Sequence, residues 1–170
     1  VFEVLTTQKM DNLILHIGKI SAGFFKKSDK VVAQINIERR LNISRNHTAT
    51  HILQAALREV LGNHIQQQGS LVAEEKFRFD FTHFKGLSEE EIARVEEVAN
   101  SFIAKNQAVS CKEMTFKDAK KAGALAFFEE KYGENVRVVT IGDISKELCA
   151  GTHLSNVKEI GLIKILNEGS

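Results

Sequence analysis

The sequence is organised around Arg45-Asn46-His47-Thr48-Ala49-Thr50-His51, which places two histidines four residues apart. Apolar residues recur with helical spacing around this stretch, so a helix is predicted from about residue 44 to residue 61. On a helical wheel the apolar stripe falls on one face, and His47 and His51 fall near the opposite face. Side chains four apart on a helix lie together, so the pair is typical either of surface histidines or of half a metal site.

A second pair of ligand-type residues stands about a hundred positions later, in Leu148-Cys149-Ala150-Gly151-Thr152-His153. Cysteine sulfur and histidine nitrogen are the ligands of most tetrahedral Zn²⁺ sites. The two pairs together could hold one ion that ties the helix to a remote loop, with Gly151 allowing that loop to turn. A zinc peptidase is disfavoured, because no glutamate stands between the two histidines to act as general base.

Composition places the chain among soluble globular proteins, with 170 residues, 43% hydrophobic and 26% charged. The net charge of +1 is not that of a dedicated nucleic-acid binder, so contact with RNA would rest on a local patch or on other domains. The sequence has no run of membrane length and no leader, so we expect a cytoplasmic chain without a membrane partner. Cys111 and Cys149 are expected to be unpaired, with Cys111 packed in a strand. Both ends suggest a piece of a longer protein.

Alternation and turn residues predict an α+β fold, with a mostly antiparallel sheet and covering helices. Residues 1–40 have the short strands and close turns of part of a small β-barrel, and residues 41–170 form the main domain. Strands are expected over 30–37, 76–83, 108–114, 136–141 and 160–166. Further helices are expected over 88–103, 115–123 and 124–133.

Two stretches allow both a structural and a functional interpretation. The three glutamines at residues 66–68 can hydrogen-bond a polar substrate, but a solvated strand or loop is preferred because Gln usually lies at the surface. Phe77, Phe79 and Phe81 share one face of a strand. They can stack nucleobases, but packing in the core is preferred.

These motifs resemble the editing domain of alanyl-tRNA synthetases, and freestanding editing proteins of the AlaX kind share the same core. The shared sequence motifs occur in the same order and with the same spacing: RNHTATHIL at 45–53, QGSLV at 68–72, FRFDF at 77–81, EKYG at 130–133 and ELCAGTH at 147–153. The resemblance runs from about residue 43 to residue 168, and residues 1–40 resemble the end of the β-barrel that precedes the editing domain. Ala150 and Glu129 stand where the family usually has glycine.

The resemblance implies an aminoacyl-tRNA deacylase within an ATP-dependent alanine–tRNA ligase. It would hydrolyse the ester of tRNA(Ala) mischarged with serine or glycine, and the other domains of the parent synthetase would be its partners. The Zn²⁺ ligands carried over are His47, His51, Cys149 and His153. Thr50 and Gln67 match positions that line the family's editing pocket, and with Cys149 they are the expected catalytic residues. A pocket that hydrogen-bonds the hydroxyl of serine leaves polar groups unpaired when alanine enters.

Several alternatives remain open at the level of sequence. Four protein ligands are typical of a structural zinc, so the ion would either activate water or hold the substrate. Asp80 and Glu130 are the carboxylates within the shared motifs. For each of them a salt-bridged or solvated role is preferred to a catalytic one. The chain could also be a zinc-stapled RNA-binding module without hydrolase activity, a freestanding AlaX-type protein, or the related editing domain of threonyl-tRNA synthetase. The sequence around Cys149 resembles the editing domain of alanyl-tRNA synthetase more than that of threonyl-tRNA synthetase.

Overall fold

A computed structural model describes residues 1–11, 13–126 and 133–169 of the chain. Its contacts divide the chain into two compact units, Val1–Ile35 and Asn36–Ser170. Most of the helical piece expected over 124–133 lies outside the described residues. Within the described residues, every helix is too short or too polar to cross a membrane.

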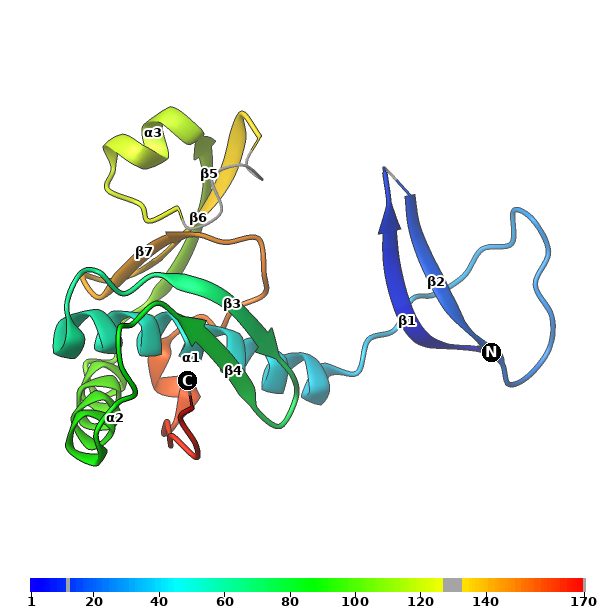
Figure 1. The fold of residues 1–170 in the computed structure, drawn as a ribbon. Helices are drawn as coiled ribbons and strands as arrows, with labels where there is room; N and C mark the ends of the chain where they lie inside the picture. Colours follow the sequence, from blue (N-terminus) through cyan, green and yellow to red (C-terminus); the bar gives the residue numbers. More distant parts are fainter. Residues whose placement is uncertain (12, 127–132, 170) are drawn as a thin grey trace. The chain divides into compact units, whose positions relative to one another are not determined.

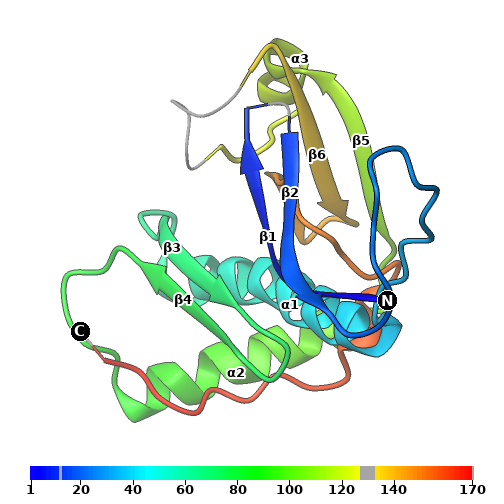
Figure 2. The ribbon, with the colours of Figure 1, turned by 90° about the vertical axis from the view of Figure 1, so that its right-hand side faces the viewer.

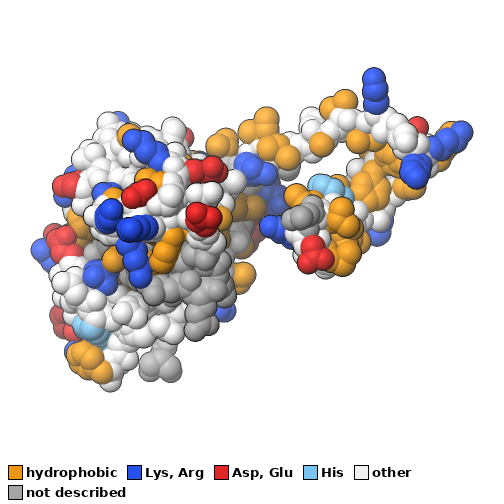
Figure 3. Space-filling view, turned by 90° about the horizontal axis from the view of Figure 1, so that it is seen from above, with side chains coloured by type: hydrophobic (Ala, Val, Ile, Leu, Met, Phe, Trp, Pro, Cys, Tyr) orange, Lys and Arg blue, Asp and Glu red, His pale blue; other side chains and the backbone are white. Residues whose placement is uncertain are grey.

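The first unit is an antiparallel hairpin of β1 (Phe2–Met10) and β2 (Leu13–Ile20). No closed barrel is present among its described residues, and its place in a barrel stays a prediction. The strand expected over 30–37 is wrong, because no neighbouring strand pairs with this segment in the described structure. Many apolar side chains of the unit are exposed, as the orange atoms of Figure 3 show. They include Val4, Leu5, Leu13, Ile14, Ile17, Ile20, Phe24 and Val32.

The second unit is built on α1 (Ile37–Leu61), which contains the stretch with the two histidines. The helix begins earlier than the predicted residue 44, because the Asn36 side chain accepts a hydrogen bond from the backbone N–H of Arg39 at 3.0 Å and caps the first turn. Apolar and polar residues alternate just before the helix. This pattern is typical of a strand, so the sequence alone does not indicate where the helix begins. The predicted end is confirmed, since Gly62 follows Leu61 with a positive φ of 114°.

Helix α1 is the centre of the unit, and the other layers pack around it (Figures 1 and 2). It contacts α2 (Glu89–Ala104), the hairpin of β3 (Gln67–Val72) and β4 (Phe77–Phe81), strand β7 (Ser145–Leu148) and the 3₁₀ turn η2 (Val157–Ile160). The main core lies between these elements. Its buried members include Ala49, Ile52, Ala56, Leu57, Ile65, Val95, Ala99, Phe102, Ile141 and Val157.

A three-stranded antiparallel sheet has the order β5 (Val109–Thr115), β6 (Asn135–Ile141) and β7. A short helix, α3 (Phe116–Lys121), follows β5 directly, and the Thr115 side chain caps it. A smaller apolar cluster joins α3 to the sheet through Ala119, Val136, Val138 and Leu148. Helices on antiparallel sheets make this an α+β fold, which confirms the predicted fold class.

Two local predictions are confirmed in the helices and strands that flank α1. Ser88 and Glu91 form a capping box at the start of α2, with each side chain bonded to the other residue's backbone N–H. Phe77, Phe79 and Phe81 of β4 all pack against the main core, as the alternating pattern predicts.

The strand expected over 160–166 is wrong, because a side chain takes the role of a pairing strand there. Asn100 of α2 accepts a hydrogen bond from the N–H of Ile163 at 2.9 Å and donates one to its carbonyl at 2.9 Å. The carboxylate of Glu96 accepts a further bond from the N–H of Ile165 at 2.8 Å. The apolar run is therefore held against α2 by two polar side chains, and Ile163 is buried in the core.

We expect Asn100→Ala to lower the free energy of unfolding by about 2 kcal/mol, because it leaves the N–H and C=O of Ile163 without partners. Urea unfolding followed by circular dichroism measures the loss. Asn135→Ala, at an exposed position, is the matched control and should change stability by less than about 0.5 kcal/mol. Equal stability of the two variants would contradict the role of the Asn100 amide.

Candidate metal centre

Four side chains from two distant parts of the chain converge on one point. The ligand atoms of His47, His51, Cys149 and His153 all lie within 4.8 Å of one another. The sulfur of Cys149 is 3.4 Å from Nε2 of His47. The His153 ring centroid lies 4.4 Å from that of His47 and 4.9 Å from that of His51. The structure thus brings together the four residues that the sequence predicts as ligands.

The environment of these side chains fits a metal ion. Nε2 of His51 and both ring nitrogens of His153 are shielded from solvent and have no hydrogen-bond partner. Buried polar atoms are nearly always paired in folded proteins, so these nitrogens indicate an electron acceptor that completes the site. Three imidazole nitrogens and one thiolate are a donor set typical of tetrahedral zinc.

His51 is more enclosed than the helical wheel indicates. Its exposed fraction is 5%, and Thr48, Thr50 and Gln54 beside it are also buried. Of the two alternatives left open for this face of α1, exposed surface histidines do not apply to His51. Strand β7 packs on α1, and a wheel of one helix contains no information about such a neighbour.

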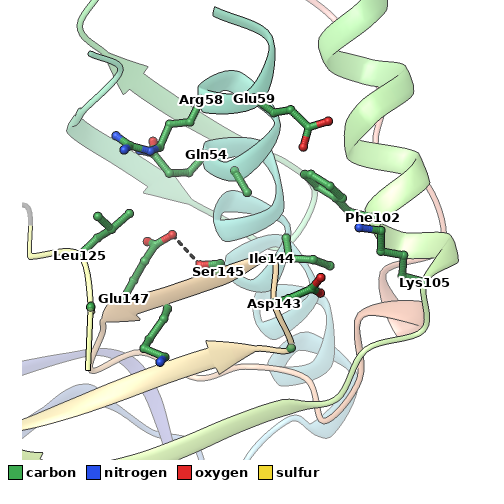
Figure 4. A pocket seen from close by; sticks show the side chains of 14 residues that line it. Gln54, Arg58, Glu59, Phe102, Lys105, Leu125, Asp143, Ile144, Ser145 and Glu147 are labelled. Carbon is green, nitrogen blue, oxygen red and sulfur yellow. Dashed lines mark hydrogen bonds between the residues drawn. The ribbon is translucent and has the colours of Figure 1, made fainter. Parts of the chain in front are cut away.

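Glu147 of β7 contacts one of the four clustered side chains, His51. Its Oε2 lies 2.8 Å from Nδ1 of His51, and its Oε1 accepts a hydrogen bond from the Ser145 hydroxyl at 2.7 Å (Figure 4). The side chains of Glu147 and His51 are 5% and 6% exposed. A carboxylate on one ring nitrogen orients the other nitrogen and makes the ring a stronger ligand.

The charges around the four side chains favour a cation between them. Burial would lower the pKa of His51, but Glu147 and then Cys149 raise it to about 10. Burial would likewise raise the pKa of the Cys149 thiol, but the rings of His153, His47 and His51 lower it to about 3. The pKa of His153 is lowered, chiefly by burial. These shifts favour a proton on His51 beside a Cys149 thiolate, and a metal cation would take the place of that proton next to the thiolate and Glu147.

The loop that supplies Cys149 and His153 is held by two side chains that sequence reasoning missed. The hydroxyl of Thr48, which is fully buried in α1, accepts a hydrogen bond from the N–H of Leu154 at 3.0 Å. The guanidinium of Arg137 in β6 donates to the carbonyls of Cys149 and Gly151. These bonds fix both ends of the ligand-bearing loop.

Gly151 is required by close packing rather than by a special backbone angle. A Cβ at this position would overlap the imidazole ring of His47. The sequence prediction gave Gly151 the role of a free turn, whereas its φ lies outside the positive range. Only a residue without a side chain lets the loop lie against His47.

The other predicted site residues have different surroundings. Thr50 is 5% exposed, and its hydroxyl donates to the carbonyl of His47 at 2.7 Å. Gln67 is half-buried at the start of β3, opposite Phe81 in the ladder, and its role stays a prediction. Asp80 is paired with Arg78 at 2.8 Å, which confirms the salt-bridged role. Glu129 and Glu130 lie outside the described residues.

One signal in the sequence could have found Glu147. It stands two residues before Cys149 near the end of a strand, so alternation places both side chains on the same face. Thr48 and Arg137 carry no comparable signal, because their partners are backbone groups far away in sequence. Cys111 is unpaired as expected, but it is exposed rather than packed, and its sulfur lies 3.0 Å from Nη2 of Arg137.

We expect Gly151→Ala to weaken Zn²⁺ binding on the order of 10–100-fold, because the new methyl group displaces the His47 ring. Competition with a chromophoric chelator measures the affinity. Gly86→Ala is the matched control, since the nearest atom to its added Cβ lies 3.9 Å away. Unchanged zinc affinity in Gly151→Ala would show that His47 is not a ligand.

The chain is similar to known proteins over its whole length. Residues 136–170 match the family described as "Threonyl and Alanyl tRNA synthetase second additional domain". Over 170 residues the chain is 51% identical to an alanine–tRNA ligase of Clostridioides difficile, covering 99% of this chain and 19% of that protein. It is 52% identical to alanine–tRNA ligase 1 of Lachnoclostridium phytofermentans over 168 residues, covering 98% of this chain and 19% of that protein.

The chain therefore spans about a fifth of the length of these curated relatives. The matched family covers β6, β7 and the loop with Cys149 and His153, whereas the relatives also cover α1 with His47 and His51. Together these matches support an alanyl-tRNA synthetase domain related to editing.

Proposed function

We propose that this chain hydrolyses the ester bond of tRNA(Ala) mischarged with serine or glycine, as part of an alanine–tRNA ligase. One observation carries the proposal. Side chains from α1 and from the loop after β7 meet in a cluster of three imidazoles and one thiolate, in which Nε2 of His51 and both ring nitrogens of His153 are buried without a hydrogen-bond partner. The similarity to alanine–tRNA ligases supports both tRNA(Ala) and the other domains of the parent synthetase as partners.

The four ligands would hold Zn²⁺, which supplies a Lewis acid that polarises an ester carbonyl or a water molecule. Glu147 keeps His51 oriented with Nε2 toward the other ligands. Arg137 and Thr48 hold the loop so that Cys149 and His153 meet the helix. These residues position the site before a substrate enters, which avoids reorganisation during the reaction.

Thr50 is suited to test the amino-acid side chain of the substrate. Its hydroxyl proton is committed to the carbonyl of His47, so the oxygen retains lone pairs that accept hydrogen bonds. A serine hydroxyl can donate to that oxygen, and the methyl group of alanine cannot. Glycine makes no such bond, so we infer that its small size admits it.

A small cavity beside Cys149 supports a small amino acid as substrate. Its volume is about 170 Å³, and its lining includes Arg137, Cys149 and Ala150. Ala150 stands where the resemblance leads us to expect glycine, so its methyl group reduces the space next to the thiolate.

The proposal predicts that Cys149→Ala slows deacylation of seryl-tRNA(Ala) by about 100-fold or more, since Lewis-acid stabilisation is worth several kcal/mol. Release of radiolabelled serine by the full-length protein measures the rate, and zinc analysis of the same sample measures loading. Ser110→Ala is the control, because this residue is exposed and lies outside the cluster, so the rate should be unchanged.

The competing function is a zinc-stapled RNA-binding module. It predicts that the zinc-loaded wild-type protein binds tRNA(Ala) but releases serine no faster than the uncatalysed reaction. That result would overturn the proposed hydrolase. Cleavage of alanyl-tRNA(Ala) as fast as seryl-tRNA(Ala) would contradict the role given to Thr50.

A further inference from the structure

Two histidines that take no part in the metal centre meet near the C-terminal end of α1. His64 lies in the loop after the helix, and His83 follows shortly after β4. Nε2 of His64 is 2.9 Å from Nδ1 of His83. The helix ends at Leu61, about 21 Å along its axis from His47, so this pair is separate from the proposed catalytic site.

The backbone around the two rings is fixed by one residue, Thr82. Its hydroxyl accepts a hydrogen bond from the N–H of Gln66 at 3.0 Å and donates one to the carbonyl of His64 at 3.0 Å. The N–H of Thr82 also donates to the carbonyl of Gln66 at 3.0 Å. These three bonds hold together the segments that enter and leave the β3–β4 hairpin, so the rings are kept close without help from their own contact.

Ring contacts limit the orientations of both imidazoles. The ring centroid of Phe84 lies 4.3 Å from that of His83 and 5.4 Å from that of His64. Nε2 of His83 is shielded from solvent and has no hydrogen-bond partner, so Nδ1, which faces His64, is the nitrogen open to a ligand. The two facing nitrogens therefore form an ordered pair of donors at the surface.

We propose that His64 and His83 form a second metal site, which binds a divalent transition-metal ion such as Ni²⁺ or Cu²⁺. Imidazole nitrogen is a preferred ligand of these ions. Two bonds of about 2.0–2.1 Å that meet at a right angle place their nitrogens about 2.9 Å apart, which is the separation observed. A tetrahedral ion needs a wider spacing of about 3.3 Å, so the pair favours ions with square-planar or octahedral coordination.

The ion takes the place of the proton in the hydrogen bond between the two rings. A neutral imidazole can carry its single proton on either nitrogen, so both facing nitrogens can present lone pairs. The carboxylate of Glu91 in α2 interacts electrostatically with His83 and adds negative charge beside the site, although it also accepts a bond from Lys85 at 3.0 Å. Among the described residues no third His, Cys, Asp or Glu completes this pair, so water would fill the remaining positions on the ion.

A filled site would clip the loop before β3 to the end of β4. Gln67, the first residue of β3, directly follows Gln66, which Thr82 already holds. The ion would therefore stabilise the open end of the β3–β4 hairpin. None of the four residues of the metal centre belongs to this site, so the proposal goes beyond the proposed hydrolase and does not depend on it.

Titration of NiCl₂ into the zinc-loaded, ¹⁵N-labelled protein tests the site by nuclear magnetic resonance. Six-coordinate Ni²⁺ is paramagnetic and broadens the resonances of nearby nuclei. The backbone resonances of Gln66, Thr82 and Phe84 should broaden first. Those of Gly151 and Leu154 should keep their widths, because they lie at the zinc centre. Broadening confined to Gly151 and Leu154, or no broadening at about 1 mM NiCl₂, would overturn the proposal.

The variants His64→Gln and His83→Gln should each weaken Ni²⁺ binding by about 100-fold, because one imidazole alone lacks the gain from a second linked ligand. His16→Gln removes a single exposed histidine of the first unit and is the matched control, with unchanged affinity. The backbone resonances of α2 show whether each variant keeps its fold. Unchanged affinity in a folded His64→Gln or His83→Gln variant would overturn the assignment of the ligands, and the broadening pattern of the wild-type protein decides the proposal where a variant does not fold.

Discussion

The second unit depends on the docking of one loop, residues 149–154, against the middle of α1. The backbone of Gly151 packs on the ring of His47, and the Thr48 hydroxyl receives the N–H of Leu154. Two ligands lie on the helix and two on the loop, so the cluster exists only when this contact forms. About a hundred residues separate the two segments, so the contact must repay the loop-closure entropy of a long stretch of chain.

The ligands could be read from the sequence because their chemistry is local. Spacing of four residues on a helix and a Cys–His pair in a turn are visible without knowledge of the fold. The contacts that hold the site were hidden, because Thr48 and Arg137 bond to backbone groups. The segment at Ile163 was misread for the same reason, since the side chain of Asn100 supplies the hydrogen bonds that a strand would have supplied.

The middle of α1, residues 44–57, is buried or half-buried throughout, and five of the nine buried residues of the helix are polar. Thr48 and Thr50 satisfy their hydroxyls within the helix, whereas His51 and Gln54 retain ring or amide atoms without partners. An apolar helix would pack in the same place at lower cost. Such a departure from a simple amphipathic pattern is typical of binding sites in proteins.

Glu147 lies between the metal centre and a groove of about 550 Å³ that Gln54 also lines (Figure 4). One of its carboxylate oxygens is 2.8 Å from His51, and the residue also lines the groove. A molecule in the groove that moves this carboxylate changes how firmly His51 holds a cation. Thermodynamic linkage makes the effect reciprocal, so the cation changes the affinity of the groove by the same factor. A single buried side chain therefore contacts both the metal-ligand cluster and the groove.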